Sequence, residues 1–427
     1  MRRRREPLST GLVSVGLIAV LAATACGAQP APTQLSSDQA RVVVDPSEAV
    51  ALPRLVAAAD AMALDLVAAA GDVTTVTSPA SLQVALSMAA EGAEGQTLSE
   101  LESLIGATGQ ERTEGMNALT GALADLDGDP AVVQEDELPE VPVVHRASRL
   151  LVDDSLAVKQ SFVDALARSY DAPAQTADLA GGDGRVVLDA WVDEHTGGLV
   201  PRSAIVPGPE LRLVVQDAIV LAARWEQPFL AEVTRPHPFT LPSGEEVEVD
   251  MMSSGGYGDT AYVQVEGWQG VRLPYTGGRL SADVILPPPG SSPLDLGTPV
   301  LEQLLGGLDT QPRRPLLLRM PVVDARSTLD LMSYLGDRVP SSLEGGFGGI
   351  TDQEQLVISQ AAQQGVLVID EDGTLAAALT EVGAAGSAPL EPPLELVVDR
   401  PYLVRVSDAR TGWTLFLAYV ADPRGER

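Results

Sequence analysis

The chain has 427 residues, of which 45% are hydrophobic, so it is long enough to bury a sizeable core. Its formal net charge of −31 argues against nucleic acid or another polyanion as a partner, because such partners need clustered cations. The single cysteine, Cys26, excludes an internal disulfide.

The first 25 residues have the composition of an export segment. Residues 2–5 are arginines, residues 11–23 are mostly apolar, and Cys26 directly follows small residues. This arrangement resembles a bacterial lipobox, whose cysteine is lipidated and becomes the mature N-terminus, although Ala23 stands where leucine is usual. We predict a lipoprotein signal peptide over residues 1–25 and a lipid on Cys26 that holds the protein at the outer face of the bacterial membrane. Ordinary secretion is the alternative.

Residues 26–45 are rich in Ala, Pro, Gln, Ser and Thr and show no apolar periodicity. Such a composition is typical of a flexible linker. We therefore predict a lipid-anchored tether over residues 26–45 and a single folded domain over residues 46–427.

The folded part begins with two helix signals. Residues 52–70 are apolar at helical spacing up to Gly71, which predicts a helix over this stretch. Ser78 precedes Pro79 and a second apolar stretch, so we expect Ser78 to cap a helix whose first residue is Pro79.

The rest of the chain mixes helix and strand signals without regular alternation. Helices are predicted over residues 161–170, over 188–199 and near 329–335, and strands over residues 147–152, 213–222 and 280–287. This mixture predicts an α+β architecture.

An acidic stretch over residues 125–142 raises the question of a calcium site. Asp125, Asp127 and Asp129 have the spacing that opens a calcium loop, but Pro130 replaces the required glycine and Asp136 the bidentate glutamate. A solvated insertion is the favoured interpretation, and no metal site is predicted.

Common enzyme motifs are absent from the sequence. His145, His195 and His237 are far apart and lack metal-ligand spacing, no serine stands in G-x-S-x-G, and Lys159 is not placed for S-x-x-K. A hydrolase whose triad comes from distant residues is kept only as a minor alternative. We predict a protein that is not an enzyme and binds no cofactor.

The most informative stretch follows a strand signal over residues 366–369. Read with a period of two, one face of the next segment consists of small residues: Thr374, Ala376, Ala378, Thr380 and Val382. A segment of this kind can exist as an exposed loop and also as a central strand, because its small face is easily buried.

This pattern resembles the reactive-centre loop of the serpins, a family of serine-protease inhibitors. The residues that correspond to the family's hinge are Glu371, Gly373, Thr374, Ala376, Ala377, Ala378 and Thr380. Residues 77–97 are similar to the family's Ser-Pro-x-Ser segment, and residues 397–404 resemble its closing signature, with Tyr402 in place of phenylalanine. The resemblance covers nearly everything after the tether.

The resemblance implies a serpin fold, in which mixed β-sheets are surrounded by helices and a reactive-centre loop, here about residues 371–393, is exposed. It implies a monomer that irreversibly inhibits an extracellular serine protease: the protease cuts the loop, is trapped as a covalent acyl-enzyme, and the loop inserts into the main sheet. A non-inhibitory serpin-fold protein, a binding or chaperone-like module that is merely cleaved, is the alternative.

The position of the reactive bond depends on which end of the loop is used for counting. The family's spacing from Gly373 gives the bond Ser387–Ala388, whereas counting back from Pro401 moves it toward Pro389 and Leu390. A small residue at the bond suits an elastase-like or subtilisin-like protease, and Leu390 suits a chymotrypsin-like one. The first assignment is favoured.

The family's sheet-opening region corresponds to Ser78, Ser81 and Trp225, together with Asp217 and Gln363 where the family pairs an asparagine with a histidine. We hypothesise that Asp217 accepts a hydrogen bond from the Gln363 amide in place of the usual bond. The alternative is that both side chains contact only water.

Overall fold

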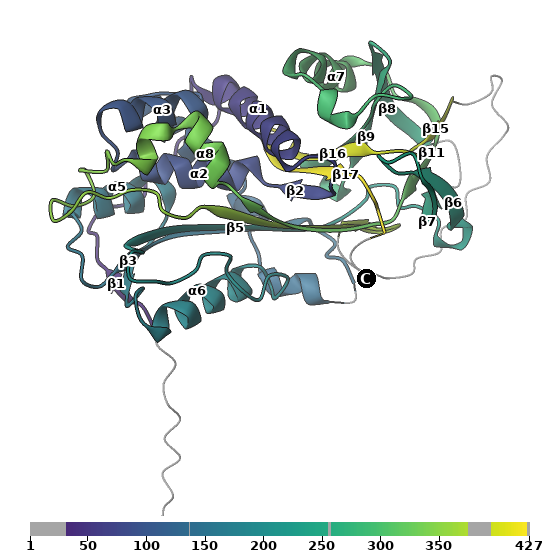
Figure 1. Cartoon of the computed structure of the whole chain (residues 1–427). Coiled ribbons are helices and arrows are strands. Elements are labelled where there is room, and N and C mark those ends of the chain that lie inside the picture. The colour runs from purple at the N-terminus through teal and green to yellow at the C-terminus, as the bar shows by residue number, and fades with distance from the viewer. Residues whose placement is uncertain (1–30, 136, 255–257, 375–393, 425–427) are drawn as a thin grey trace, which may run out of the picture.

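In the computed structural model, which describes residues 31–135, 137–254, 258–374 and 394–424, helices pack around two β-sheets (Figure 1). This arrangement confirms the α+β architecture predicted from the sequence. The helices are α1 (Leu52–Ala70), α2 (Pro79–Ala90), α3 (Gly95–Ile105), α4 (Gly109–Ala122), α5 (Gln160–Tyr170), α6 (Gly182–His195), α7 (Thr298–Thr310) and α8 (Met332–Arg338).

The first sheet carries the hinge. Its seven strands follow the order β1-β4-β3-β5-β14-β13-β12. Their bounds are β1 Thr33–Leu35, β4 Ala174–Ala177, β3 Val143–Asp153, β5 Leu213–Arg224, β14 Gly373–Thr374, β13 Ala362–Ile369 and β12 Val323–Asp330. Helix α6 lies on the face of this sheet opposite to α1 and α2 (Figure 1).

The second sheet has ten strands in the order β2-β17-β16-β10-β9-β8-β11-β7-β6, with β15 paired to β11. Their bounds are β2 Thr75–Thr77, β17 Thr414–Val420, β16 Tyr402–Asp408, β10 Leu280–Leu286, β9 Trp268–Pro274, β8 Gly258–Val265, β11 Arg314–Pro321, β7 Glu246–Ser253, β6 Arg235–Thr240 and β15 Leu394–Val397. The main core joins both sheets to α1 and α2, so the two sheets share one hydrophobic interior.

The early helix predictions are confirmed. Helix α1 spans the predicted residues and ends before Gly71, whose φ of 76° is strained for any residue with a Cβ. Helix α2 begins at Pro79, and the Ser78 side chain accepts a hydrogen bond from the Ser81 amide as its N-cap.

Two predicted boundaries are wrong. Helix α6 begins at Gly182 and ends at His195, so it starts before the predicted residue 188 and stops before 199. Leu329 is paired with Gln363 in the sheet, and the next helix, α8, begins only at Met332. At Leu329 strand pairing overrides local helix propensity, whereas α6 ends before Gly197 and Gly198, whose φ angles of 58° and 81° do not continue a helix.

The tether prediction is corrected from Thr33 onward. Strand β1 pairs with the edge strand β4, with Thr33 opposite Thr176, and Leu35 packs on the main core. Further on, the Asn117 side chain donates to the Val42 carbonyl and accepts from the amide of Val44. A segment without apolar periodicity is ordered here because an open strand edge and a buried amide satisfy its backbone groups.

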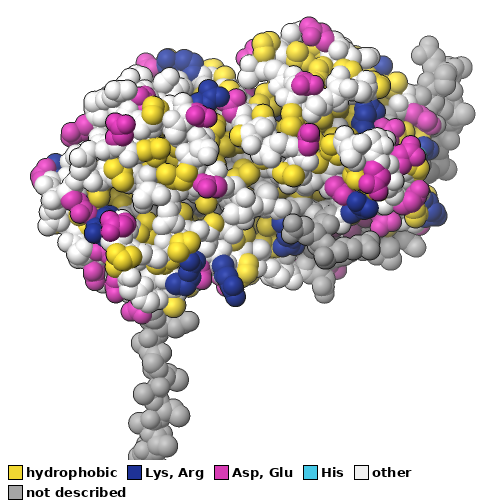
Figure 2. Space-filling model, in the orientation of Figure 1, with side chains coloured by type: hydrophobic (Ala, Val, Ile, Leu, Met, Phe, Trp, Pro, Cys, Tyr) yellow, Lys and Arg dark blue, Asp and Glu magenta, His cyan; other side chains and the backbone are white. Residues whose placement is uncertain are grey.

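The surface shows how the strong negative charge is distributed. Acidic side chains are scattered over the visible face and do not gather in one patch (Figure 2). Among the described residues, no helix combines the length and the apolar character needed to cross a bilayer.

Candidate functional site

The predicted hinge begins as a short strand between two long ones. Gly373 pairs with Arg224 of β5, and Thr374 pairs with Ala223 of β5 on one side and Ile369 of β13 on the other. The start of the hinge therefore already occupies the end of the space between β5 and β13.

The turn that leads into β14 is held by Asp370. Its carboxylate accepts hydrogen bonds from the amides of Asp372 (3.0 Å) and Gly373 (3.1 Å), and its own amide donates to the Gly373 carbonyl. Burial raises the pKa of Asp370 to about 6, although the hydrogen bonds from these amides oppose the rise. The turn is thus built around a carboxyl group that titrates near neutral pH.

Gly373 is required here by close packing. A Cβ at this position would lie 2.1 Å from the Ala223 carbonyl oxygen and 2.7 Å from Leu138 Cδ1. A larger residue would push β14 away from β5.

Thr374 is fixed by a buried aromatic pair. Its hydroxyl lies 2.6 Å from the hydroxyl of Tyr275, whose ring is stacked on Trp225 with centroids 4.5 Å apart. Burial raises the pKa of Tyr275, so the phenol remains neutral, and either hydroxyl can donate the hydrogen bond between Tyr275 and Thr374.

Trp225 also holds the backbone that precedes the hinge. Its indole nitrogen donates to the Asp370 carbonyl (3.0 Å), and its amide donates to the Asp372 carbonyl (2.8 Å). The carbonyl of Glu371 accepts a hydrogen bond from the Phe229 amide, and the carboxylate of Glu371 accepts one from the Thr234 hydroxyl. The structure therefore brings Glu371, Gly373, Thr374 and Trp225 together.

Beyond Thr374 the two long strands separate. Among the described residues, β5 and β13 have no further pairing with each other, and a cavity of about 250 Å³ lies between and beneath them. We call this space the strand gap. Its lining includes Ser78, Ser81, Asp217, Ile219, Gln363 and Leu367, from α2, β5 and β13.

Asp217 borders the strand gap, but its partners differ from those predicted. It accepts hydrogen bonds from Arg146 (3.0 Å) and from the Ser148 hydroxyl, both on β3. Burial raises its pKa, and the neighbouring Arg146, Ser148 and Ser81 oppose the rise. Its other oxygen, Oδ1, is buried and receives no hydrogen bond from the described residues.

The hypothesis of a bond between Asp217 and Gln363 is therefore wrong. The Gln363 amide nitrogen donates to the Ser78 carbonyl (2.7 Å), and its oxygen accepts from the Ser78 amide (2.9 Å) and the Thr77 hydroxyl (2.7 Å). Glutamine takes this position because its amide can both donate to and accept from one backbone residue. Gln363 is thus satisfied by its own neighbours, whereas Asp217 has partners on β3 for only one of its two carboxylate oxygens.

The remaining predicted site residues lie outside the described residues. They are Cys26 at the lipidation site, Ala376, Ala377, Ala378 and Thr380 of the hinge, and Ser387, Ala388, Pro389 and Leu390 at the reactive bond.

The structure joins two histidines that the sequence separates by 50 residues. His145 Nε2 on β3 lies 3.1 Å from His195 Nδ1 on α6, and His145 Nδ1 lies 2.9 Å from the carboxylate of Asp127. No sequence signal indicated this contact, because it depends on where α6 crosses the sheet.

The three acids of the calcium hypothesis do not converge. Asp125 pairs with Arg279, Asp127 with His145, and Asp129 caps the short helix at Pro130–Gln134. Within the part of the chain that the structure describes, no three His, Cys, Asp or Glu side chains form a group that could hold a metal ion.

Comparison with known proteins gives a consistent result. The family described as "Serpin (serine protease inhibitor)" matches residues 58–423. The chain is 26% identical over 356 residues to an uncharacterized serpin-like protein of Thermococcus kodakarensis, covering 81% of this chain and 80% of the relative. It is 28% identical over 365 residues to the leukocyte elastase inhibitor of Bos taurus, covering 81% and 92%.

Solved structures show the same fold. The native state of the thermophilic serpin tengpin matches with a TM-score of 0.75 at 18% identity, covering 92% of this chain and 99% of that one. Serpin48 of the insect Tenebrio molitor matches with a TM-score of 0.71 at 22% identity, covering 87% and 98%. At these identities the likeness concerns the fold alone.

Proposed function

The chain belongs to the serpin family, and we propose that it inhibits an extracellular serine protease irreversibly, by loop cleavage, acyl-enzyme trapping and loop insertion. The observation that carries the proposal is the strand gap, with Gly373 and Thr374 already paired at one end of it. Because the protease supplies the reactive serine, the inhibitor needs no catalytic group of its own.

The register at the hinge predicts how the inserted strand would fit. If the pairing at Thr374 continues, Ala376 comes to lie between Leu221 and Leu367, and Ala378 lies between Ile219 and Gly365. Leu221 and Leu367 both belong to the main core, which is the inward side. Ala376 would therefore meet two leucines, and Ala378 an isoleucine and a glycine, so the inserted face buries only small side chains of the loop.

The same register brings Thr380 between Asp217 and Gln363. A threonine hydroxyl at that position can donate to the unpartnered Oδ1 of Asp217. Insertion would thereby satisfy a buried acceptor that the described residues leave without a donor. The gain supports insertion because an unsatisfied buried acceptor costs roughly 1–3 kcal/mol.

A direct test uses the protein beginning at Gly27, so that β1 is retained. It is incubated with elastase-like, subtilisin-like and chymotrypsin-like proteases and run on denaturing gels. We expect a complex with one protease that survives SDS, and sequencing of the released C-terminal peptide identifies the reactive bond, with Ser387–Ala388 favoured over the Leu390 position.

Thr374→Arg serves as the paired variant, because a buried charge beside Tyr275 opposes insertion. It is expected to be cleaved without forming the complex, whereas Glu395→Arg on exposed β15 behaves as the unmodified protein. Cleavage without a complex by every protease would favour the non-inhibitory binding or chaperone-like alternative.

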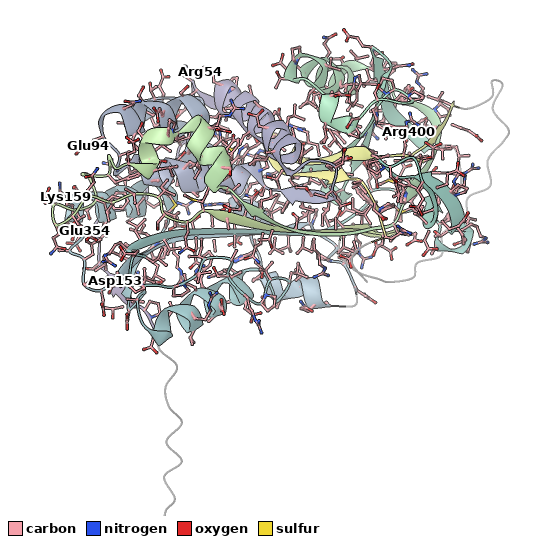
Figure 3. The ribbon with its side chains drawn as sticks, viewed as in Figure 1. Arg54, Glu94, Asp153, Lys159, Glu354 and Arg400 are labelled. Carbon is pink, nitrogen blue, oxygen red and sulfur yellow. The ribbon has the colours of Figure 1, made fainter. Side chains whose placement is uncertain are left out.

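We also propose that the protein is exported and anchored through a lipid on Cys26. The seven residues from Gly27 to Thr33 span at most about 25 Å. Strand β1 lies at the end of the molecule that carries Asp153, whereas Arg400, near the return from the loop, lies at the opposite end (Figure 3). The anchor would hold the hinge end away from the membrane, toward extracellular proteases.

The anchor is tested by partition of the expressed protein into detergent and by mass spectrometry of its N-terminal peptide. Cys26→Ser should move the protein into the aqueous phase. A wild-type protein found entirely in the aqueous phase, without a lipid mass, would indicate ordinary secretion.

A further inference from the structure

Helix α6 is attached to the seven-stranded sheet in two different ways. In its first half, Val187 and Leu188 are buried in an apolar cluster with Leu151, Leu179 and Val214. Its second half presents Trp191 and His195 to polar groups of β3. The first half is therefore held by burial of apolar surface, and the second by directional polar contacts.

The contact of Trp191 is with a buried arginine. The guanidinium of Arg149 lies 5.1 Å from the Trp191 ring centroid and donates to the Val187 carbonyl (2.9 Å) and to the Gln216 side chain. Arg149 is 2% exposed, and burial lowers its pKa to about 10, which leaves it charged at neutral pH.

The contact at the end of α6 is the histidine pair. The ring of His195 packs against Trp191 with centroids 4.6 Å apart, and its Nδ1 faces His145 Nε2 at 3.1 Å. Asp127 accepts from Nδ1 of His145, which assigns the proton of that ring to Nδ1 and makes Nε2 an acceptor. His195 Nδ1 is therefore the donor between the two rings.

This proton arrangement has a limit. One additional proton on the pair leaves the contact intact, because one ring still offers a lone pair to the other. With a second, both rings are cations and two N–H groups face each other across 3.1 Å. The contact is thus stable with one extra proton and repulsive with two.

The segment held by this pair covers the strand gap. Trp191, Val192 and Thr196 line the gap from the outer side of the sheet. The chain that follows α6 is bound to β13 and the residues before it: Gln364 accepts from the Ala204 amide (2.8 Å), and Gln360 accepts from the Val206 amide (2.9 Å). The second half of α6 thus spans from β3 toward β13, over the path of an inserting strand.

We propose that His145 and His195 are positioning residues for loop insertion: they hold the second half of α6 over the strand gap, and acid releases it. The proposal rests on the proposed function, because insertion is the step that the second half of α6, lying over the strand gap, would slow. The first half of α6 remains docked through Val187 and Leu188, so it acts as the fixed end when the second half moves.

The surrounding charges set the direction of the pH effect. Burial lowers the pKa of His195, and the positive charges of His145 and Arg149 lower it further, whereas Glu194 on α6 and Asp127 raise it. A histidine whose pKa is lowered while α6 lies over the strand gap binds a proton more readily once that half of α6 is released. The arrangement with α6 over the gap is therefore fully favoured above the ordinary histidine pKa of about 6.5 and loses that advantage as the pH falls.

The first measurement reports on the contact between His145 and His195. Trp191 fluorescence, taken as the difference from Trp191→Phe, is followed between pH 7.5 and 5. We expect a transition in this window, because protonation of His195 places an imidazolium, which quenches indole, beside Trp191, and release of the helix withdraws the indole from Arg149. His195→Gln should abolish the transition, whereas His237→Gln, at a distant, half-buried histidine on β6, should retain it. A signal that does not change with pH, or that survives in His195→Gln, overturns the proposal.

The second measurement tests whether the contact between His145 and His195 controls insertion of the loop. The fraction of cleaved inhibitor that ends in SDS-stable complex is compared between wild type, His145→Gln and His195→Gln at each pH, so that the pH dependence of the protease cancels. We expect the wild type to gain about threefold over both variants between pH 7.5 and 5.5, less than the tenfold of a full one-unit shift because His195 is partly exposed.

The two possible failures are distinguishable. Parallel pH profiles of wild type and variants overturn the proposal that the two histidines hold α6, but they leave the inhibitory function intact. No complex from the wild type at any pH overturns the proposed function, and the Trp191 titration then still decides whether acid changes the surroundings of the second half of α6.

Discussion

The two sheets of this molecule are completed to different degrees. In the ten-stranded sheet, β16 pairs with β10 on one side and β17 on the other, and every residue of these three strands is buried. In the seven-stranded sheet, the described residues join β5 and β13 only through the two residues of β14, and the two strands otherwise border the strand gap. One sheet is closed, whereas the other retains an open position.

The difference indicates which sheet already stabilises the fold and which sheet could still gain stabilising contacts. Closed pairing and close packing of the ten-stranded sheet stabilise the fold that exists. The open position could gain backbone hydrogen bonds and packing only if a further strand entered. Under the proposed function, a barrier rather than a lower free energy keeps the described form from converting into the completed one.

The largest effect is expected in the closed sheet. Trp413, just before β17, is fully buried and donates to Gln83 (3.0 Å). Trp413→Ala should lower the free energy of unfolding by about 3–5 kcal/mol, because it leaves a cavity and an unpaired amide oxygen. The midpoint of urea unfolding measures this.

Ile219→Ala is the matched control in the open sheet. Its side chain borders the strand gap, so removing it creates little new cavity and should cost only about 1 kcal/mol. Equal losses for the two variants would contradict the distinction between a closed and an open sheet.

The next effect concerns the joint between β5 and β13. Gly373→Ala would place a methyl group 2.1 Å from the Ala223 carbonyl oxygen, so β14 must leave its position. We expect about a tenfold loss in the ratio of trapped to merely cleaved inhibitor, measured by titration against the target protease. Unfolding by urea serves as the control and should change little, and an unaltered ratio would show that the β14 pairing does not prepare insertion.

The smallest effect is the titration of Asp370. Its pKa is raised to about 6 against an ordinary 3.8, so the hinge turn gains stability as the pH falls through 6, and the gain is complete below about 4. Asp370→Asn keeps an acceptor without the charge and should remove this dependence. Because the carboxyl is partly exposed, we expect a difference of only about 2 °C in the thermal midpoint between pH 7.5 and 5. Identical pH profiles for the two proteins would contradict this assignment.

Part of the site was predictable from local chemistry. The small face that begins at Thr374 was predicted from its period of two, which needs no knowledge of the rest of the fold, and the resemblance to the serpin hinge added Gly373. The partners of Asp217 were not predictable, since they come from β3 through a strand register fixed only in the assembled sheet. The same holds for the N-terminal segment, whose composition indicates a tether and whose order depends on the open edge of β4.

The sequence by itself determined the elements whose cause is local: the extent of α1 and the cap at Ser78. Only the tertiary structure decided the gap between β5 and β13 and the contact of His145 with His195. The physical reason is that capping and periodicity act over a few residues, whereas a cavity or a contact across 50 residues exists only after strands and helices have packed.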